Sequence, residues 1–332
     1  YGRSDIWPHM QRMYEGYLAE PSQEASRRGW RSVYAAVAYQ AGRLDVARAQ
    51  LEALNWDPLP VKLTGWGRDL SLLPLEVAAR TGGLGKQVEA AESSRTRGDL
   101  AKALKLYQEM EASKNADERS RTFIRHRLAA LAVEEPMSRG DWINFLPATQ
   151  SDLNWTLTRG KSWRLVDGAL EVQAGADGHI LHSRVPVGDE FEVKGEFEVV
   201  RSSSKDFQAG LVMGVSDYDS QDWYGFRVKR NDSEGDIACV SMRWGNERIF
   251  KPMKLNGDRN SFLFVLQAHK VSAWVNDQPV CVNVKPPLFL NVPGDQFYLG
   301  VGAYNDMNET VIRYRNLQVR SLKVRPPRVR KP

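Results

Sequence analysis

Residues 261–280, SFLFVLQAHKVSAWVNDQPV, decide the fold of this chain. Apolar side chains recur at every second position, and this alternation is typical of strands with one face buried. Two short interruptions, at His269-Lys270 and at Asp277, carry residues that favour tight turns. The stretch therefore predicts three consecutive strands that reverse direction twice, as in an antiparallel meander.

The same alternation extends in both directions, from about residue 141 to residue 322. At least ten strand-like segments follow one another there, with turn residues between them and no helical spacing. One hairpin tip is predicted at residues 230–236, RNDSEGD, between two alternating segments. Strands at this spacing predict an antiparallel β-sandwich of the jelly-roll type over residues 142–322.

Upstream of this region the apolar spacing changes to that of helices. Residues 1–135 predict a domain of α-helical hairpins, with glycines and prolines separating the helices. Residues 136–141 predict a linker, and residues 323–332 a basic tail rich in Pro and Arg. The fold class is therefore multidomain α plus β, with the helices at the N-terminal end.

Two of the predicted hairpins, residues 30–54 and 90–110, resemble tetratricopeptide repeats. Each has a turn glycine, a small residue where two helices would touch, and a large residue one turn later. These are Gly42, Ala47 and Leu51 in the first hairpin, and Gly98, Ala103 and Tyr107 in the second. The resemblance implies a surface that docks partner subunits. Because the spacing of the two glycines departs from the regular repeat, an ordinary helical bundle remains the alternative.

The order of the β motifs resembles the concanavalin A-like lectin/glucanase superfamily, in its laminin-G-like or keto-glycoside-hydrolase-like branch. The resemblance rests on residues 273–277, AWVND, before a turn, and on the closing segment 312–319, IRYRNLQV. Helical repeats followed by such a sandwich resemble large exported proteins of unknown function from planctomycete-type bacteria. This likeness implies an extracytoplasmic location, in the periplasm or at the cell surface.

Charge and cysteine usage exclude some functions. The net charge is +5, and the last ten residues carry five Lys or Arg with no Asp or Glu, so the basic excess is not a basic face of a domain. This argues against nucleic acid as a partner. No apolar run is long enough for a transmembrane segment. The two cysteines, Cys239 and Cys281, lie in strand-like segments and are expected to be buried thiols, with a disulfide left open.

An acidic row at residues 189–198, DEFEVKGEFE, is the nearest candidate for catalytic carboxylates. Glu190, Glu192, Glu196 and Glu198 would share one face of a strand, with Lys194 among them. Apolar residues occupy the other face, so we interpret the row as the outward side of a half-buried strand. The E-x-D-x-E pattern of the related glycoside hydrolases is missing, which argues against hydrolysis.

Aromatic residues give a different candidate site. Sugar rings stack their C–H faces on exposed aromatic rings, and Asn and Asp supply hydrogen bonds. Trp223 and Tyr224 follow an Asp-rich segment, while Tyr304, Asn305 and Asp306 end a strand. These five residues are the candidate carbohydrate-binding residues. Trp274 is expected in the core instead, as most strand aromatics are.

The only cofactor that the sequence leaves open is calcium. Asp217, Asp219 and Asp222 in the segment SDYDSQD could supply oxygen ligands from one loop. Short Asp-rich turns also occur without metal, so no cofactor is the main expectation.

Together these features predict a non-catalytic structural or interaction protein. The helical hairpins would dock other protein subunits, and the sandwich would serve assembly or glycan binding. The alternative is a glycan-active hydrolase with a diverged active site.

Overall fold

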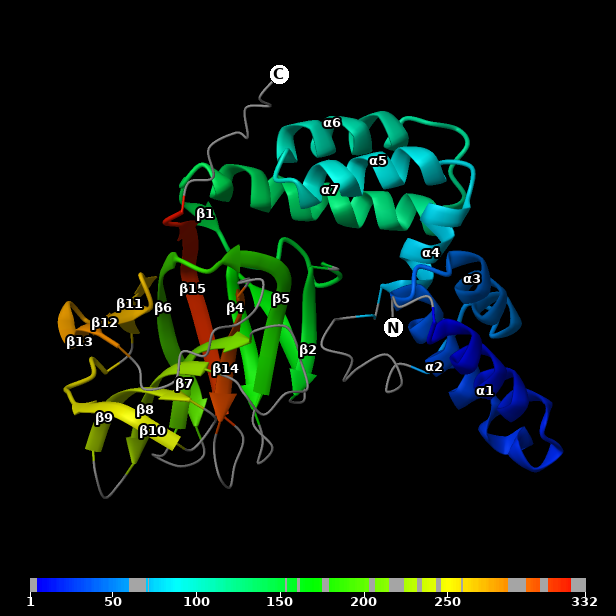
Figure 1. Ribbon diagram of the computed structural model, residues 1–332. Coiled ribbons are helices and arrows are strands. Elements are labelled where there is room, and N and C mark those ends of the chain that lie inside the picture. The colour runs from blue at the N-terminus through cyan, green and yellow to red at the C-terminus, as the bar shows by residue number, and fades with distance from the viewer. Residues whose placement is uncertain are drawn as a thin grey trace. The chain divides into compact units, whose positions relative to one another are not determined.

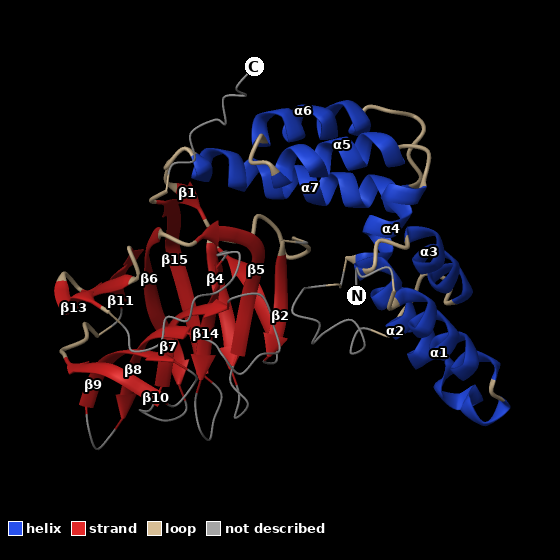
Figure 2. Ribbon diagram, viewed as in Figure 1, coloured by secondary structure: helices blue, strands red, loops and turns tan. Residues whose placement is uncertain are grey.

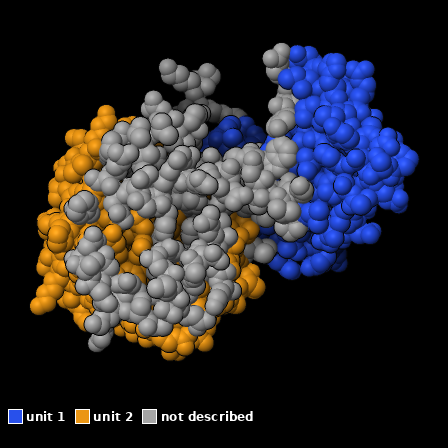
Figure 3. All heavy atoms as spheres, turned by 90° about the horizontal axis from the view of Figure 1, so that it is seen from below, with its two compact units in different colours: residues 1–131, 327–332 blue, residues 132–326 orange. Residues whose placement is uncertain are grey.

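A computed structural model describes residues 5–59, 70, 72–152, 154–159, 162–174, 179–202, 207–214, 224–231, 235–242, 246–257, 259–285, 297–304 and 310–323. The chain divides into two compact units, residues 1–131 and 132–326 (Figure 3). The basic tail beyond Lys323 lies outside the described residues.

The N-terminal unit is built from helices (Figures 1 and 2). They are α1 (Trp7–Ala19), the 3-10 helix η1 (Pro21–Ser26), α2 (Arg27–Gln40), α3 (Leu44–Ala53), α4 (Leu73–Thr81), α5 (Gly85–Thr96), α6 (Leu100–Glu111) and α7 (Glu118–Ser138), which continues into the second unit. Helix α2 packs against α3, and α5 against α6.

The turn glycines of these two hairpins have left-handed backbones. The φ angle is 73° at Gly42 and 81° at Gly98, a region that glycine enters without steric cost. Ala47 and Ala103 are completely buried, so the helices approach closely at these positions. The predicted helical hairpins are therefore present, whereas membership of a repeat family stays a prediction.

Proline lies at three helix boundaries. Helices α1 and α4 carry Pro8 and Pro74 in their first turn, where the missing N–H costs no hydrogen bond. Helix α7 continues through Pro136 to Ser138, so residues 136–138 of the predicted linker are helical. Gly140, with a φ of 84°, follows the helix end.

Fifteen strands make up the described part of the second unit. They are β1 (Ile143–Asn144), β2 (Trp155–Arg159), β3 (Ser162–Val166), β4 (Ala169–Ala174), β5 (His179–Gly188), β6 (Phe191–Ser202), β7 (Phe207–Gly214), β8 (Tyr224–Asn231), β9 (Gly235–Met242), β10 (Asn246–Pro252), β11 (Arg259–Gln267), β12 (Lys270–Val275), β13 (Gln278–Val284), β14 (Phe297–Tyr304) and β15 (Thr310–Ser321). Their predicted antiparallel pairing is confirmed by the register of each ladder, and the fold class is as predicted.

The strands form two sheets. Sheet A has the order β13-β12-β11-β6-β15-β4-β3, and β1 pairs with β15 beyond the end of β4. Sheet B has the order β10-β9-β8-β7-β14-β5-β2. The meander predicted for residues 261–280 is β11-β12-β13, and positive φ angles at Ala268, His269, Asn276 and Asp277 make its two tight turns.

The core of the sandwich lies between the sheets. Phe226 of sheet B contacts Phe262 and Phe264 of sheet A, with ring centroids 6.2 and 5.9 Å apart. Tyr314 crosses the core, accepting a hydrogen bond from the backbone N–H of Gly210 and donating one to the carbonyl of Gly302. Side chains of sheet A that do not point into this core form its outer face, which carries the candidate site.

Both cysteines are buried thiols, Cys239 in β9 of sheet B and Cys281 in β13 of sheet A. Burial raises the pKa of Cys281, so this thiol stays protonated near neutral pH. The sequence had left a disulfide open, and the structure resolves it in favour of two thiols.

Candidate functional site

The predicted carbohydrate-binding residues lie largely outside the described residues. Trp223, Asn305 and Asp306 lie there, as do the predicted calcium ligands Asp217, Asp219 and Asp222. The backbones of Tyr224 and Tyr304 are described: they pair with Met213 and Gln208 of β7. These partners are five residues apart, about 17 Å along β7. The backbones of the two tyrosines therefore lie near different positions along this strand.

The described residues contain a groove of about 710 Å³ on the outer face of sheet A. It crosses β15, β6, β11 and β12, which are neighbours in the sheet. Two tryptophans, one leucine and eight polar side chains line the groove. They are Trp142, Glu192, Lys194, Glu196, Ser261, Leu263, Trp274, Asn276, Asp277, Asn316 and Gln318, with the inward-facing Gly195 and Phe262 below.

Strand register arranges the floor of the groove in rows. One row runs across four strands through Gln318, Lys194, Leu263 and Trp274, each directly opposite the next. Directly paired residues project to the same face of an antiparallel sheet, so these four side chains are neighbours. The row gives the groove an apolar strip, Leu263 and Trp274, beside an ammonium and an amide.

Trp274 is a correction to the sequence prediction, which placed it in the core. Its neighbours in β12, Ala273 and Val275, are buried, while Trp274 is half-buried and lines the groove. Alternation along the strand sends Trp274 to the opposite face from Ala273 and Val275. The alternation of apolar residues in the sequence therefore indicates the outward face, whereas the aromatic character of Trp274 alone indicates the core.

Trp142 closes the other side of the groove, just before β1. The Nζ atom of Lys194 lies 4.2 Å from the centroid of its ring, and Cζ of Arg320 lies 4.6 Å from it. Both distances are in the range of cation–π attraction. Sequence analysis missed Trp142, because its role depends on where the chain crosses β6 and β15, and no local pattern shows this.

Polar groups at one end of the groove are held in place by short hydrogen bonds. Asn276 Nδ2 donates to Asn260 Oδ1 at 2.8 Å, and Asn276 Oδ1 accepts from the backbone N–H of Ser261 at 3.0 Å. Asn316, whose φ is 50°, sits at an irregularity in the β15–β6 pairing and donates to Glu196 Oε1 at 3.1 Å. These contacts fix the amides before any ligand arrives, which lowers the entropic cost of binding.

Three glutamates of the predicted acidic row, Glu192, Glu196 and Glu198, have an arginine of a neighbouring strand within 4 Å. Two nitrogens of Arg320 contact Glu192 Oε2 at 2.8 and 2.5 Å. Arg259 lies 3.5 Å from Glu196, and Arg313 lies 3.5 Å from Glu198. The prediction that these glutamates face outward is confirmed by the alternating burial along β6. They are not simply solvated, however, because arginines of β11 and β15 pair with them.

Next to this row, Glu171 of β4 is the most deeply buried carboxylate of the outer face, at 3% exposed. Burial alone would raise the pKa of Glu171, but hydrogen bonds from Arg313 and Arg164 outweigh it, and the pKa is lowered. Glu171 is therefore charged at neutral pH. It pairs with Arg313, which also lies near Glu198 of the acidic row.

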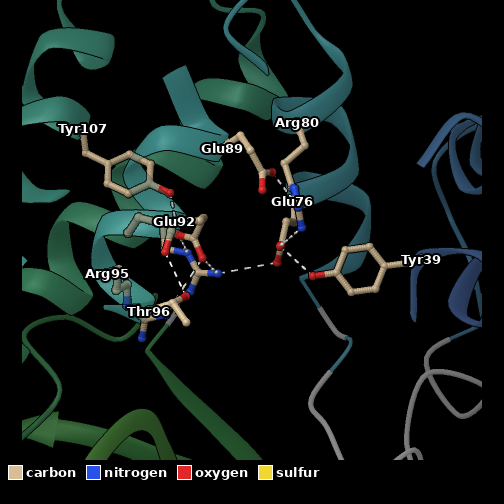
Figure 4. A network of polar contacts seen from close by, with 9 residues as sticks. Tyr39, Glu76, Arg80, Glu89, Glu92, Arg95, Thr96 and Tyr107 are labelled. Atoms are coloured by element: carbon tan, nitrogen blue, oxygen red, sulfur yellow. Dashed lines mark hydrogen bonds and ion pairs between the residues drawn. The ribbon is translucent and has the colours of Figure 1, made fainter. Parts of the chain in front are cut away.

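The helical unit contains a separate polar network (Figure 4). Tyr39 donates to Glu76 at 2.6 Å, and Tyr107 donates to Glu92 at 2.6 Å. Arg127 joins the two halves, lying 3.5 Å from Glu76 and 3.0 Å from Glu92. The five residues come from α2, α4, α5, α6 and α7, so the network links most helices of the unit.

We interpret this network as a structural one that holds the helices together. Burial would raise the pKa of Glu92, yet Arg127, Arg95 and the bond from Tyr107 lower it, so the carboxylate stays charged. Burial and the charge of Glu92 raise the pKa of Tyr107, which therefore remains a hydrogen-bond donor. Among the described residues, no group of three His, Cys, Asp or Glu side chains could hold a metal ion.

Comparison with known proteins gives structural neighbours only. No family model matches the chain, and no curated protein matches it. Of the helices in the described residues, none has the length and apolar character of a membrane span.

Three of the similar solved structures are described by their identity and coverage. The carbohydrate recognition domain of Emp46p in its potassium-bound form is 14% identical, with a TM-score of 0.41 over 53% of this chain and 93% of that one. A protein of unknown function with a galectin-like fold from Bacillus subtilis is 9% identical, with a TM-score of 0.42 over 53% and 93%. The carbohydrate-binding module CBM66 from Bacillus subtilis is 13% identical, with a TM-score of 0.39 over 51% and 96%. The assignment of a β-sandwich itself rests on the strand register and core contacts given above.

Proposed function

We propose that the β-sandwich unit is a non-catalytic carbohydrate-binding module and that the groove on the outer face of sheet A is a binding site. The observation that carries the proposal is the placement of Trp274. It is a half-buried aromatic ring on the outward face of a strand, beside prearranged amides. A pyranose ring can stack its C–H face on such a ring while its hydroxyls bond to the amides.

The carboxylates of the groove favour binding over catalysis. Retaining and inverting hydrolases need one carboxyl group that can act as an acid and a second that is free to act as nucleophile or base. Glu192 is held by Arg320, and Glu196 by Asn316 with Arg259 close by. Neither carboxylate is therefore free of partners, as a nucleophile or general base would have to be.

The sequence-derived site remains part of the proposal as a second region of contact. Trp223 and Tyr224 would contribute at the start of β8, and Tyr304, Asn305 and Asp306 at the end of β14. A calcium ion would take its oxygen ligands from Asp217, Asp219 and Asp222. An extracytoplasmic location would give such a module access to surface glycans.

For the helical unit we propose protein partners as the second function. Ile6, Met13 and Tyr17 are more than a third exposed on and just before α1, at intervals of seven and four residues. This spacing places them on one side of the helix. Exposed apolar side chains of this kind favour contact with another protein subunit, and mass determination of the natively purified protein tests this.

A glycan array with the whole protein tests the carbohydrate proposal. We expect binding that Trp274→Ala abolishes and Trp274→Phe retains in part, because a smaller ring still offers a stacking face. Tyr17→Ala in the helical unit is the matched control and leaves binding unchanged. Trp223→Ala and Tyr304→Ala report whether the second region contributes.

Two results would contradict the proposal. An array without any glycan bound removes it, and so does binding that survives Trp274→Ala, Trp223→Ala and Tyr304→Ala alike. Release of new reducing ends from a bound glycan would replace it with the alternative, a glycan-active hydrolase with a diverged active site.

A further inference from the structure

Lys194 differs from the other cations on the outer face of β6, β11 and β15. Arg259, Arg313, Arg315 and Arg320 each lie within 4 Å of a glutamate. For Lys194, in the middle of the acidic row, no carboxylate lies within that distance in the part of the chain that the structure describes. Its ammonium instead lies over the uncharged ring of Trp142, 4.2 Å from the ring centroid.

The glutamates on either side of Lys194 have other partners. Glu192 is paired with Arg320, and Glu196 receives a hydrogen bond from Asn316 and has Arg259 at 3.5 Å. The two arginines therefore compensate these two carboxylates, and the ammonium of Lys194 adds one positive charge. With Asp277, at the turn after β12, these charges sum to zero, so the positive charge that an anion would meet is the ammonium of Lys194 itself, beside glutamates that already have other partners.

The ammonium is also held in position. A lysine on a fully solvated strand face has a mobile side chain, but Lys194 is half-buried and its Nζ atom lies over the ring of Trp142. A ring contact leaves N–H donors of the ammonium available, since a lysine carries three of them. Trp142 thus holds the ammonium of Lys194 in position, and N–H donors of this ammonium remain available to a ligand.

Lys194 and Trp274 stand in one row, with Leu263 between them. Two strand spacings separate their backbones, about 10 Å. A sugar ring stacked on Trp274 can therefore direct a substituent across Leu263 towards the ammonium. The anionic group and the stacking ring would then contact the two sides of the same groove.

We propose that the groove selects a sugar that carries an anionic group, and that Lys194 is the specificity-determining residue. This inference rests on the proposed function, because it names the class of glycan that the groove would take. The charged group is a carboxylate, as in a uronic acid, or a sulfate ester, since an ammonium binds either one as a point charge.

Matched pairs of glycans test the inference. Binding of the whole protein to polygalacturonate oligosaccharides is compared with binding to the same oligosaccharides after reduction of their carboxyl groups, and a sulfated galactan is compared with its desulfated form. We expect the anionic member of at least one pair to bind more tightly, and added salt to reduce this preference. Which pair responds identifies the anionic group.

Variants then assign the preference to Lys194. We expect Lys194→Gln to weaken binding of the preferred anionic glycan by about tenfold or more, since a hydrogen bond to a charged group is lost. Binding of its neutral counterpart should not change. Lys194→Arg should restore much of the preference, and Lys270→Gln, an exposed lysine at the start of β12, should have no effect.

The outcomes separate this inference from the proposed function. If neither anionic glycan is preferred, or if Lys194→Gln weakens charged and neutral glycans equally, the inference is wrong while glycan binding stands. If Trp274→Ala leaves all binding intact, the groove is not the site and both proposals for it are wrong. Circular dichroism of each variant shows that the sandwich is still folded.

Discussion

Arginine–glutamate pairs occur in both units, but the arginines of the helical network are more buried than Arg164 and Arg320 on the outer face of sheet A. In the network, Arg127, Glu76 and Glu92 have side chains that are 14, 12 and 17% exposed. On the sheet, Arg164 is 71% exposed opposite Glu171, and Arg320 is 36% exposed opposite Glu192. Charges that are removed from water depend on their partners, whereas exposed charges can return to water at little cost.

The difference shows where a charged side chain can lack an ion-pair partner within the protein and so be available to a ligand. In the helical unit, loss of Arg127 removes a partner from two buried carboxylates at once and leaves Glu76 with Arg80 and Glu92 with Arg95. On the sheet, pairs such as Arg164–Glu171 and Arg320–Glu192 have an arginine that reaches solvent, so a cation without a carboxylate, such as Lys194, is tolerated there. A ligand site is easier to build on the outer face of sheet A for this reason.

The largest effect is expected from Arg127→Ala. This change leaves Glu76 and Glu92 buried without the cation that joins them. We expect the helical unit to lose about 3–5 kcal/mol of unfolding free energy, as when one partner of a buried ion pair is removed. Urea unfolding followed by circular dichroism at helical wavelengths measures the loss.

Two control variants sharpen this prediction. Arg125, on the same helix, is 60% exposed and lies 3.7 Å from Glu111, so Arg125→Ala should cost less than about 1 kcal/mol. Arg164→Ala on sheet A should also cost less than about 1 kcal/mol. If Arg164→Ala were as damaging as Arg127→Ala, the contrast between the two units would be wrong.

A smaller effect is expected from Tyr314→Phe. The phenol of Tyr314 is fully buried and bonds to backbone groups of Gly210 and Gly302 across the sandwich core. Its removal leaves both backbone groups without this partner, at a cost of about 1–3 kcal/mol to the sandwich. Thermal unfolding compares it with Tyr17→Phe, whose side chain is exposed and which should be neutral. An unchanged melting temperature for Tyr314→Phe would show that the cross-sheet bonds contribute nothing net.

The smallest effect is a difference in acid sensitivity. The pKa of Glu92 is lowered in the folded helical unit, so its charged form stabilises the fold above the ordinary pKa of glutamate, about 4.3. That contribution is lost as pH falls from this value through the lowered pKa. We expect Glu92→Gln to flatten the fall in stability of the helical unit below about pH 4. Urea midpoints measured from pH 7 to pH 3 give the slope, and a slope equal to that of the unchanged protein would contradict the assignment.

The sequence predicted the fold class because the periods of apolar residues are strong in both units. Helical spacing located the hairpins around Gly42 and Gly98, and alternation located the strands, including the turns of the β11-β12-β13 meander. One boundary was less predictable, because α7 continues through Pro136, which the sequence assigned to the linker. A proline inside a helix removes a backbone hydrogen bond, so the residue pattern favoured an earlier end.

The candidate site was harder to predict. Aromatic residues near strand ends predicted a site at Trp223 and Tyr304, whereas the groove is lined by Trp142, Lys194 and Trp274. Trp142 and Trp274 are 132 positions apart in the chain. They line one groove because β15, β6, β11 and β12 are adjacent in the sheet, although the order of these strands in the chain is different.

The amino-acid sequence by itself determined which segments are helices or strands and which side of each strand faces the core, since these follow from local periodicity. Only the tertiary structure decided the neighbours: Lys194 beside Trp142 and in the row of Trp274, and Arg127 between Glu76 and Glu92. Periodicity specifies a face but not the strand or helix that lies next to it. That choice is made by the packing of the whole core, which no short stretch of sequence contains.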